Sequence, residues 1–131
     1  MGFSSKAFAA ETLMNYRETE VRNGFTQGAF EVKKAGLVEI NNCIERWTTS
    51  DRSRQNMRVE VWQRVGVGQY KLLTHTRFND VKLKPVSDGS FYHGGGGCLT
   101  RIAYLGVGIY KLKFISADTG AYVTVSGTVV K

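Results

Sequence analysis

Cationic and aromatic side chains interleave on segments that the sequence predicts to be β-strands. On one of these segments, Arg58, Trp62 and Arg64 share the polar face, and on another Lys111 and Lys113 face outward. Aromatic rings beside cations can stack on a sugar, bind single-stranded nucleic acid or lie at a membrane interface. We therefore predict a ligand-binding set made of Trp62, Arg58, Arg64, Lys111, Lys113 and Arg101.

The net charge supports a polyanionic ligand. The 131 residues sum to a formal charge of +7. Up to Glu45 there are five lysines and arginines against six acids, whereas from Arg46 onward there are thirteen against five. A surface of this kind attracts nucleic acid, anionic lipid or an acidic cell-wall polymer. A second interpretation stays open, in which Trp62 is half-buried and the charges only solvate the sheet.

Two short motifs resemble parts of hydrolases. Residues 118–120 spell the Asp-Thr-Gly of aspartic proteases, but that chemistry needs two aspartates sharing a proton, and the same tripeptide is an ordinary hairpin turn. Residues 93–96 (HGGG) resemble an oxyanion-hole loop, yet the chain has no Gly-x-Ser-x-Gly elbow to accompany it. We therefore predict no catalytic residue and no enzyme activity.

The chain has two cysteines, Cys43 and Cys98. They can form one disulfide that closes a long loop, or they can both stay reduced and buried. No Cys-x-x-Cys and no grouping of cysteine with histidine is present in the sequence, so we expect no metal site and no cofactor.

Apolar residues recur at every second position over much of the chain. Met57, Val59 and Val61 alternate with polar residues, which is typical of a half-buried strand. About eight such runs are joined by short, glycine-rich connections, and short connections favour antiparallel pairing. We therefore predict an all-β protein, an antiparallel β-sandwich of jelly-roll type. Its predicted core is Phe30, Val32, Val38, Ile40, Val59, Val61, Tyr110, Leu112, Phe114, Val123, Val125 and Val129.

One internal repeat occurs within this pattern. Residues 65–72 (VGVGQYKL) match residues 105–112 (LGVGIYKL) at an offset of 40. Each copy lies between two predicted strands, where glycine can adopt the backbone conformations of tight hairpins. Two similar hairpins fit a sandwich of similar halves, and convergent turn chemistry explains them equally well.

The first residues differ from the rest, so we divide the chain into an N-terminal segment (1–24) and a β-sandwich domain (25–131). Residues 6–11 (KAFAAE) look like the end of a secretory signal. Alternatively, a short amphipathic helix begins at Ser4 or Ser5 and ends at Asn23-Gly24. The first interpretation predicts a secreted protein, and a cytoplasmic location is the alternative.

Residues 108–114 (GIYKLKF) enter a strand that is followed by a polar turn and by the alternating run 122–129 (YVTVSGTV). This combination resembles the jelly-roll domains of bacterial pre-peptidase C-terminal type, and residues 30–38 (FEVKKAGLV) look similar to their opening hairpin. The resemblance implies an extracellular accessory module that binds or positions something without catalysis. The acidic calcium ligands frequent in that family have no counterpart here.

These observations predict a non-catalytic, secreted module whose basic surface binds an anionic or sugar-bearing surface such as cell wall or anionic lipid. One alternative is a small intracellular or phage protein that binds nucleic acid or a protein partner. Another is a subunit of a β-sandwich assembly or pore-forming toxin. No segment is long and apolar enough for a transmembrane helix. The oligomeric state is not predicted.

Overall fold

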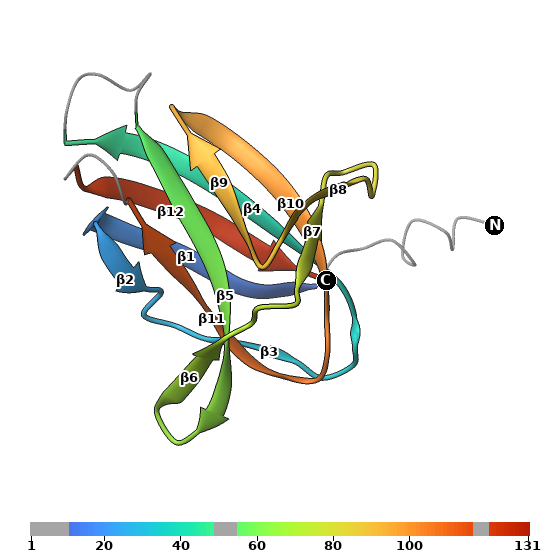
Figure 1. Ribbon diagram of the computed structural model, residues 1–131. Helices are drawn as coiled ribbons and strands as arrows, with labels where there is room; N and C mark the ends of the chain where they lie inside the picture. Colours follow the sequence, from blue (N-terminus) through green and yellow to red (C-terminus); the bar gives the residue numbers. More distant parts are fainter. Residues whose placement is uncertain (1–10, 49–54, 117–120) are drawn as a thin grey trace.

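The computed structural model describes residues 11–48, 55–116 and 121–131 of the chain. Within these residues every regular element is a β-strand, and the strands form two antiparallel sheets stacked as a sandwich (Figure 1). The strands are β1 (Thr12–Val21), β2 (Asn23–Phe25), β3 (Phe30–Val32), β4 (Gly36–Trp47), β5 (Asn56–Gly66), β6 (Gln69–Leu72), β7 (Arg77–Asn79), β8 (Pro85–Asp88), β9 (Ser90–Gly94), β10 (Gly97–Leu105), β11 (Gly108–Ile115) and β12 (Val123–Val130).

The predicted sandwich is confirmed, and its topology is that of a jelly roll. The first sheet has the order β1-β12-β4-β10-β7-β8, and the second has the order β2-β11-β5-β6, with β3 also on β11 and β9 also on β5. The chain changes sheet at the connections β1–β2, β3–β4, β4–β5, β6–β7, β8–β9, β9–β10, β10–β11 and β11–β12. Two interlocked Greek keys of this kind define the jelly-roll arrangement.

The described residues form twelve strands, not about eight. Apart from β1, the strands beyond the predicted runs are short. β2 extends the line of β3 along β11, and β6, β7 and β8 occupy the connection between β5 and β9. Three- or four-residue strands contain too few alternating positions to produce a period-two pattern, which is why the sequence did not separate them.

The expected N-terminal helix is wrong, because Thr12–Val21 forms strand β1. Met14 and Tyr16 alternate into the core, and β1 pairs with β12 along the edge of the first sheet. The described residues of segment 1–24 therefore lie within the sandwich, with β1 in one sheet and β2 in the other. The signal-like residues 6–10 lie outside the described residues.

The predicted core is confirmed in full. All twelve residues assigned to it from the period-two pattern are buried, with at most 1% of their surface exposed. They come from both sheets, and their side chains fill the space between them. The core also contains residues that the prediction did not include: Met14, Tyr16, Ile44, Trp47, Met57, Phe78, Phe91, Ala103, Leu105 and Ala121.

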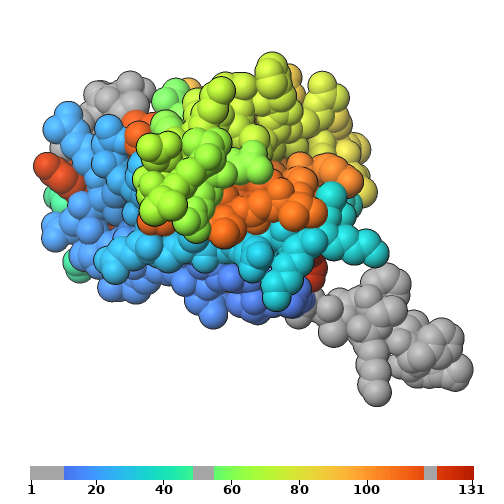
Figure 2. Space-filling view, turned by 90° about the horizontal axis from the view of Figure 1, so that it is seen from below, coloured from blue at the N-terminus to red at the C-terminus, as the bar shows by residue number. Residues whose placement is uncertain are grey.

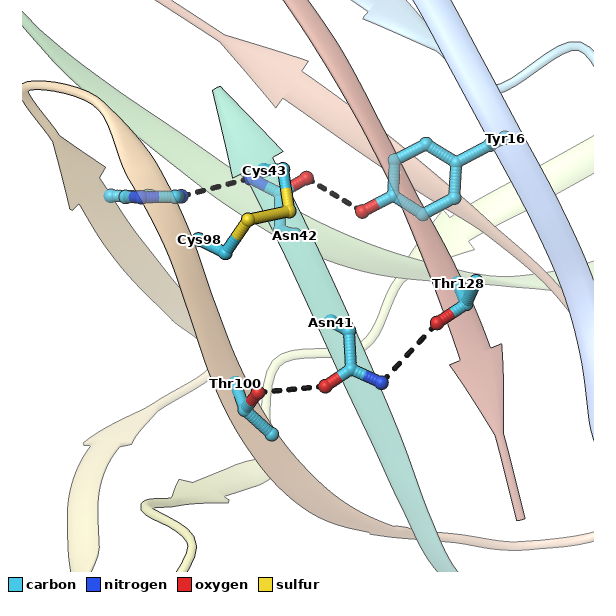
Figure 3. Close-up of a disulfide and its surroundings, with 8 residues drawn as sticks. Tyr16, Asn41, Asn42, Cys43, Cys98, Thr100 and Thr128 are labelled. Atoms are coloured by element: carbon cyan, nitrogen blue, oxygen red, sulfur yellow. Dashed lines mark hydrogen bonds between the residues drawn. A yellow bond between two sulfur atoms is a disulfide. The ribbon is translucent and has the colours of Figure 1, made fainter. Parts of the chain in front are cut away.

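Cys43 and Cys98 form a disulfide between β4 and β10, where they are directly opposite each other (Figure 3). On the same face, Asn41 accepts a hydrogen bond from Thr100 on β10 (2.7 Å) and donates one to Thr128 on β12 (3.2 Å). Strand β4 is thus tied to both of its neighbours. A cross-link between residues 55 positions apart also restricts the unfolded chain and so stabilises the fold.

Candidate functional site

Three residues of the predicted ligand-binding set lie together on the outward face of the second sheet. Lys111 on β11 is directly opposite Trp62 on β5, and Lys113 follows two positions along the same strand. Side chains two residues apart on a strand point to the same face, as do directly opposite side chains of antiparallel strands. The jelly-roll topology therefore makes neighbours of two segments that are about fifty residues apart in the sequence.

Two aromatic residues outside the predicted set complete this group. Phe25 on β2 is opposite Lys113, and its ring lies edge-on to Trp62 with centroids 5.2 Å apart. Tyr70 on β6 lies 6.3 Å from Phe25 between ring centroids. Offset and edge-to-face aromatic pairs at such distances are favourable. We call Phe25, Trp62, Tyr70, Lys111 and Lys113 the aromatic–lysine cluster.

The ammonium groups of the cluster lie over its rings. Lys113 Nζ is 4.7 Å from the centroid of Trp62 and 5.1 Å from that of Phe25, and Lys111 Nζ is 5.3 Å from that of Tyr70. These distances are those of cation–π interactions. The rings thereby hold both cations at the surface of the sheet without neutralising them.

The buried carboxylate of Glu60 orients the indole ring of Trp62 through a hydrogen bond. Glu60 is only 4% exposed although it lies on the outward side of β5, opposite Lys113. The indole N–H of Trp62 donates to Glu60 Oε1 at 3.0 Å, and Arg58 Nε lies 3.0 Å from Glu60 Oε2. Glu60 thus fixes the orientation of the indole and takes up the charge of Arg58. The structure places Arg58 beside the cluster as part of this ion pair.

A hollow of about 630 Å³ is bordered by the five cluster residues together with Gly68 and Gln69. This volume is in the range of small-molecule sites in proteins. The hollow offers aromatic surface and two ammonium groups, so it suits a ligand that has both an apolar face and a negative charge.

The two remaining arginines of the predicted set occupy different places. Arg64 lies on the outward face of β5, opposite Tyr70, and is exposed, with its Nε donating to the carbonyl oxygen of Gly66. Arg101 lies in the first sheet, opposite the buried Ile40, and its guanidinium donates to the carbonyl oxygen of Thr100. Arg101 is therefore apart from the cluster, because β10 belongs to the other sheet and directs this side chain inward.

His93, the histidine of the glycine-rich motif, is buried in a hydrogen-bonded chain that crosses the sandwich. The hydroxyl of Tyr16 donates to Asn42 Oδ1 at 2.6 Å, so the amide nitrogen of Asn42 is the donor to His93 Nδ1, 3.0 Å away. An accepting Nδ1 requires a neutral imidazole. Burial lowers the pKa of His93 and the charge of Arg101 lowers it further, against a backbone hydrogen bond at Gly96 that raises it.

This arrangement predicts a loss of stability at mildly acidic pH. Because the pKa of His93 is lower in the folded state, the unfolded chain takes up the proton first as the pH falls below about 6.5. The free energy of unfolding should therefore decrease as the pH falls through about 6.5 and below. In urea titrations, His93→Gln should flatten this decrease, whereas His75→Gln, at an exposed position, should not. Identical pH profiles for the wild type and His93→Gln would contradict the prediction.

Some predicted features remain open. Residues 118–120, with the Asp-Thr-Gly motif, lie outside the described residues. In the part of the chain that the structure describes, no group of three or more histidine, cysteine, aspartate or glutamate side chains is placed to hold a metal ion. Among the same residues no helix is long and apolar enough to cross a membrane.

No protein-family model matches the chain. No curated protein and no solved structure is significantly similar to it. The resemblance to the pre-peptidase C-terminal domains therefore stays a prediction.

Proposed function

We propose that this protein is a non-catalytic binding module that recognises an acidic saccharide through the aromatic–lysine cluster. The observation that carries the proposal is the position of two lysine ammonium groups over three aromatic rings around one hollow. Aromatic rings provide flat apolar surface for the C–H face of a sugar. The ammonium groups provide partners for a carboxylate or sulfate on the same sugar.

The charges around the cluster favour an anion over a neutral sugar. The outward face of the second sheet presents Arg64, Lys111 and Lys113, and the carboxylate of Glu60 on this face is buried and paired with Arg58. A positive field in this region attracts an acidic polymer and makes its binding sensitive to salt. The disulfide between β4 and β10 is compatible with an extracellular location, which supports a glycan over a nucleic acid as the ligand.

Exchange of the two lysines for glutamate tests the proposal. The double variant Lys111→Glu/Lys113→Glu should bind immobilised heparin, as an acidic saccharide, about tenfold more weakly or worse, because two attractive charges become repulsive. The double variant should also elute at lower salt than the wild type, because less ionic strength is needed to screen the weaker attraction. Retention on the heparin column across a salt series measures both effects.

A matched control is available on the turn between β7 and β8. Lys82→Glu/Lys84→Glu changes the net charge equally at exposed positions outside the cluster and should retain most of the binding. If both double variants lose heparin binding equally, net charge alone explains the loss, and this result would contradict a binding site at the cluster. If only Trp62→Ala lowers binding and the lysine variants do not, the ligand is recognised by stacking and is a neutral sugar.

A further inference from the structure

The internal repeat places two apolar turns side by side at one end of the sandwich. The turn between β5 and β6 carries Val67, and the turn between β10 and β11 carries Val107. Both residues border one hollow of about 480 Å³ together with Arg64 and Ile109. Figure 2 views the molecule from this end, where the green β5–β6 hairpin adjoins the orange start of β11. We call Val67 and Val107, with the glycines beside them, the twin-turn tip.

The twin-turn tip exposes apolar side chains that contribute nothing to the core. Val67 is 89% exposed and Val107 is 64% exposed, and Val65 at the base of the first turn is exposed as well. Gly68 has φ of +67°, a conformation that allows the tight turn and that L-residues rarely adopt. Tight turns of this type do not require valine at their tips, since small polar residues suit them better. The exposed valines therefore indicate a surface that becomes buried elsewhere.

Cations surround the tip. Arg64 and Lys71 are exposed on the β5–β6 hairpin. Lys33 and Lys34 are exposed and directly follow Val32, which pairs with Gly108 beside the second turn. The acid in the hollow between the turns is Glu31, so positive charge predominates around the tip.

We infer that the twin-turn tip docks on an anionic lipid bilayer, with Val67 and Val107 inserted among the headgroups. Apolar residues at the tip with lysines and arginines behind them match a bilayer interface, where the cations contact lipid phosphates. The aromatic–lysine cluster begins a few residues further along the same strands, at Tyr70 and Lys111. This inference does not depend on the proposed saccharide binding.

Sedimentation of the full chain with vesicles tests the inference. The wild type should sediment with vesicles of phosphatidylcholine mixed with phosphatidylglycerol, and much less with phosphatidylcholine alone. Val67→Asp/Val107→Asp should lower the binding constant for the anionic vesicles about tenfold or more. Two apolar groups are lost from the tip, and two negative charges face the negatively charged lipid. Val81→Asp/Val86→Asp is the matched control, since these valines are 62% and 44% exposed on the turn between β7 and β8 and on β8, away from the tip in Figure 1.

The outcomes separate the two proposals. The inference is supported if Val67→Asp/Val107→Asp loses vesicle binding, keeps heparin retention and keeps the circular dichroism of the wild type, while Val81→Asp/Val86→Asp keeps all three. It is overturned if the wild type does not sediment with the anionic vesicles. It is also overturned if the tip variant binds them like the wild type, or if only Lys111→Glu/Lys113→Glu lowers binding, since lipid attraction would then be electrostatic and centred on the cluster.

Discussion

Replacing Gly127 with alanine should destabilise the fold by about 3 kcal/mol or more, at the upper end of what overpacking costs. Gly127 lies in β12 between its partners Tyr16 on β1 and Asn42 on β4. A Cβ at this position would lie 2.5 Å from the hydroxyl oxygen of Tyr16 and 2.7 Å from its Cζ, and it would overlap the carbonyl oxygen of Asn41. The tyrosine cannot withdraw without breaking its hydrogen bond to Asn42, so the strands must separate.

Urea unfolding of Gly127→Ala measures this cost, and Gly106→Ala provides the control. A Cβ on Gly106, in the turn after β10, would meet no atom within 4 Å. Its substitution should therefore change the free energy of unfolding by no more than about 0.5 kcal/mol. Equal free-energy changes in the two variants would show that the space at Gly127 is not filled as described.

Replacing Phe114 with alanine should destabilise the fold by about 3–5 kcal/mol, the range for removing a fully buried phenylalanine. Phe114 is 0% exposed on the inward face of β11, and its ring centroid lies 5.5 Å from that of Tyr16 on β1. The contact therefore spans the two sheets, and a cavity at this point removes apolar contacts from both.

The same urea titrations check this value against Tyr104→Ala, which removes an aromatic ring from the exposed face of β10. That control should change the free energy of unfolding by about 0.5 kcal/mol or less. A change below about 1 kcal/mol for Phe114→Ala would mean that β11 directs its other face to the core.

The inward faces of the long strands could be predicted from the sequence because alternation specifies them without knowledge of partners. Val59 and Val61 on β5, and Leu112 and Phe114 on β11, were assigned correctly for this reason. Each such run requires only that one face of a strand is buried and the other is not.

The N-terminal strand could not be predicted in this way. Leu13 and Met14 are adjacent, so they also fit a loose helical stripe, and Glu18 takes the next inward position after Tyr16. Glu18 is buried because its carboxylate accepts a hydrogen bond from the backbone N–H of Gln27. A local pattern cannot reveal such a partner, and pairing with β12 decided the outcome.

The candidate site was predictable only in part, for a related reason. Trp62, Lys111 and Lys113 were found because aromatic and cationic residues stood out on predicted outward faces. Phe25 and Tyr70 were missed because the short strands β2 and β6 join the cluster only through their register with β11 and β5. The sequence also does not show which sheet a strand joins. Arg101 was assigned to the site for this reason, although its strand β10 belongs to the first sheet.

The most direct test of saccharide binding by the aromatic–lysine cluster is an NMR titration of the isotope-labelled protein with a heparin oligosaccharide. The indole N–H signal of Trp62 is a specific reporter, since this group lies in the cluster and donates to Glu60. We predict that this signal and the backbone amide signals of Tyr70, Lys111 and Lys113 shift with saccharide concentration, while those of β4 and β12 do not. Unchanged signals in the cluster, or shifts centred on the first sheet, would contradict the account.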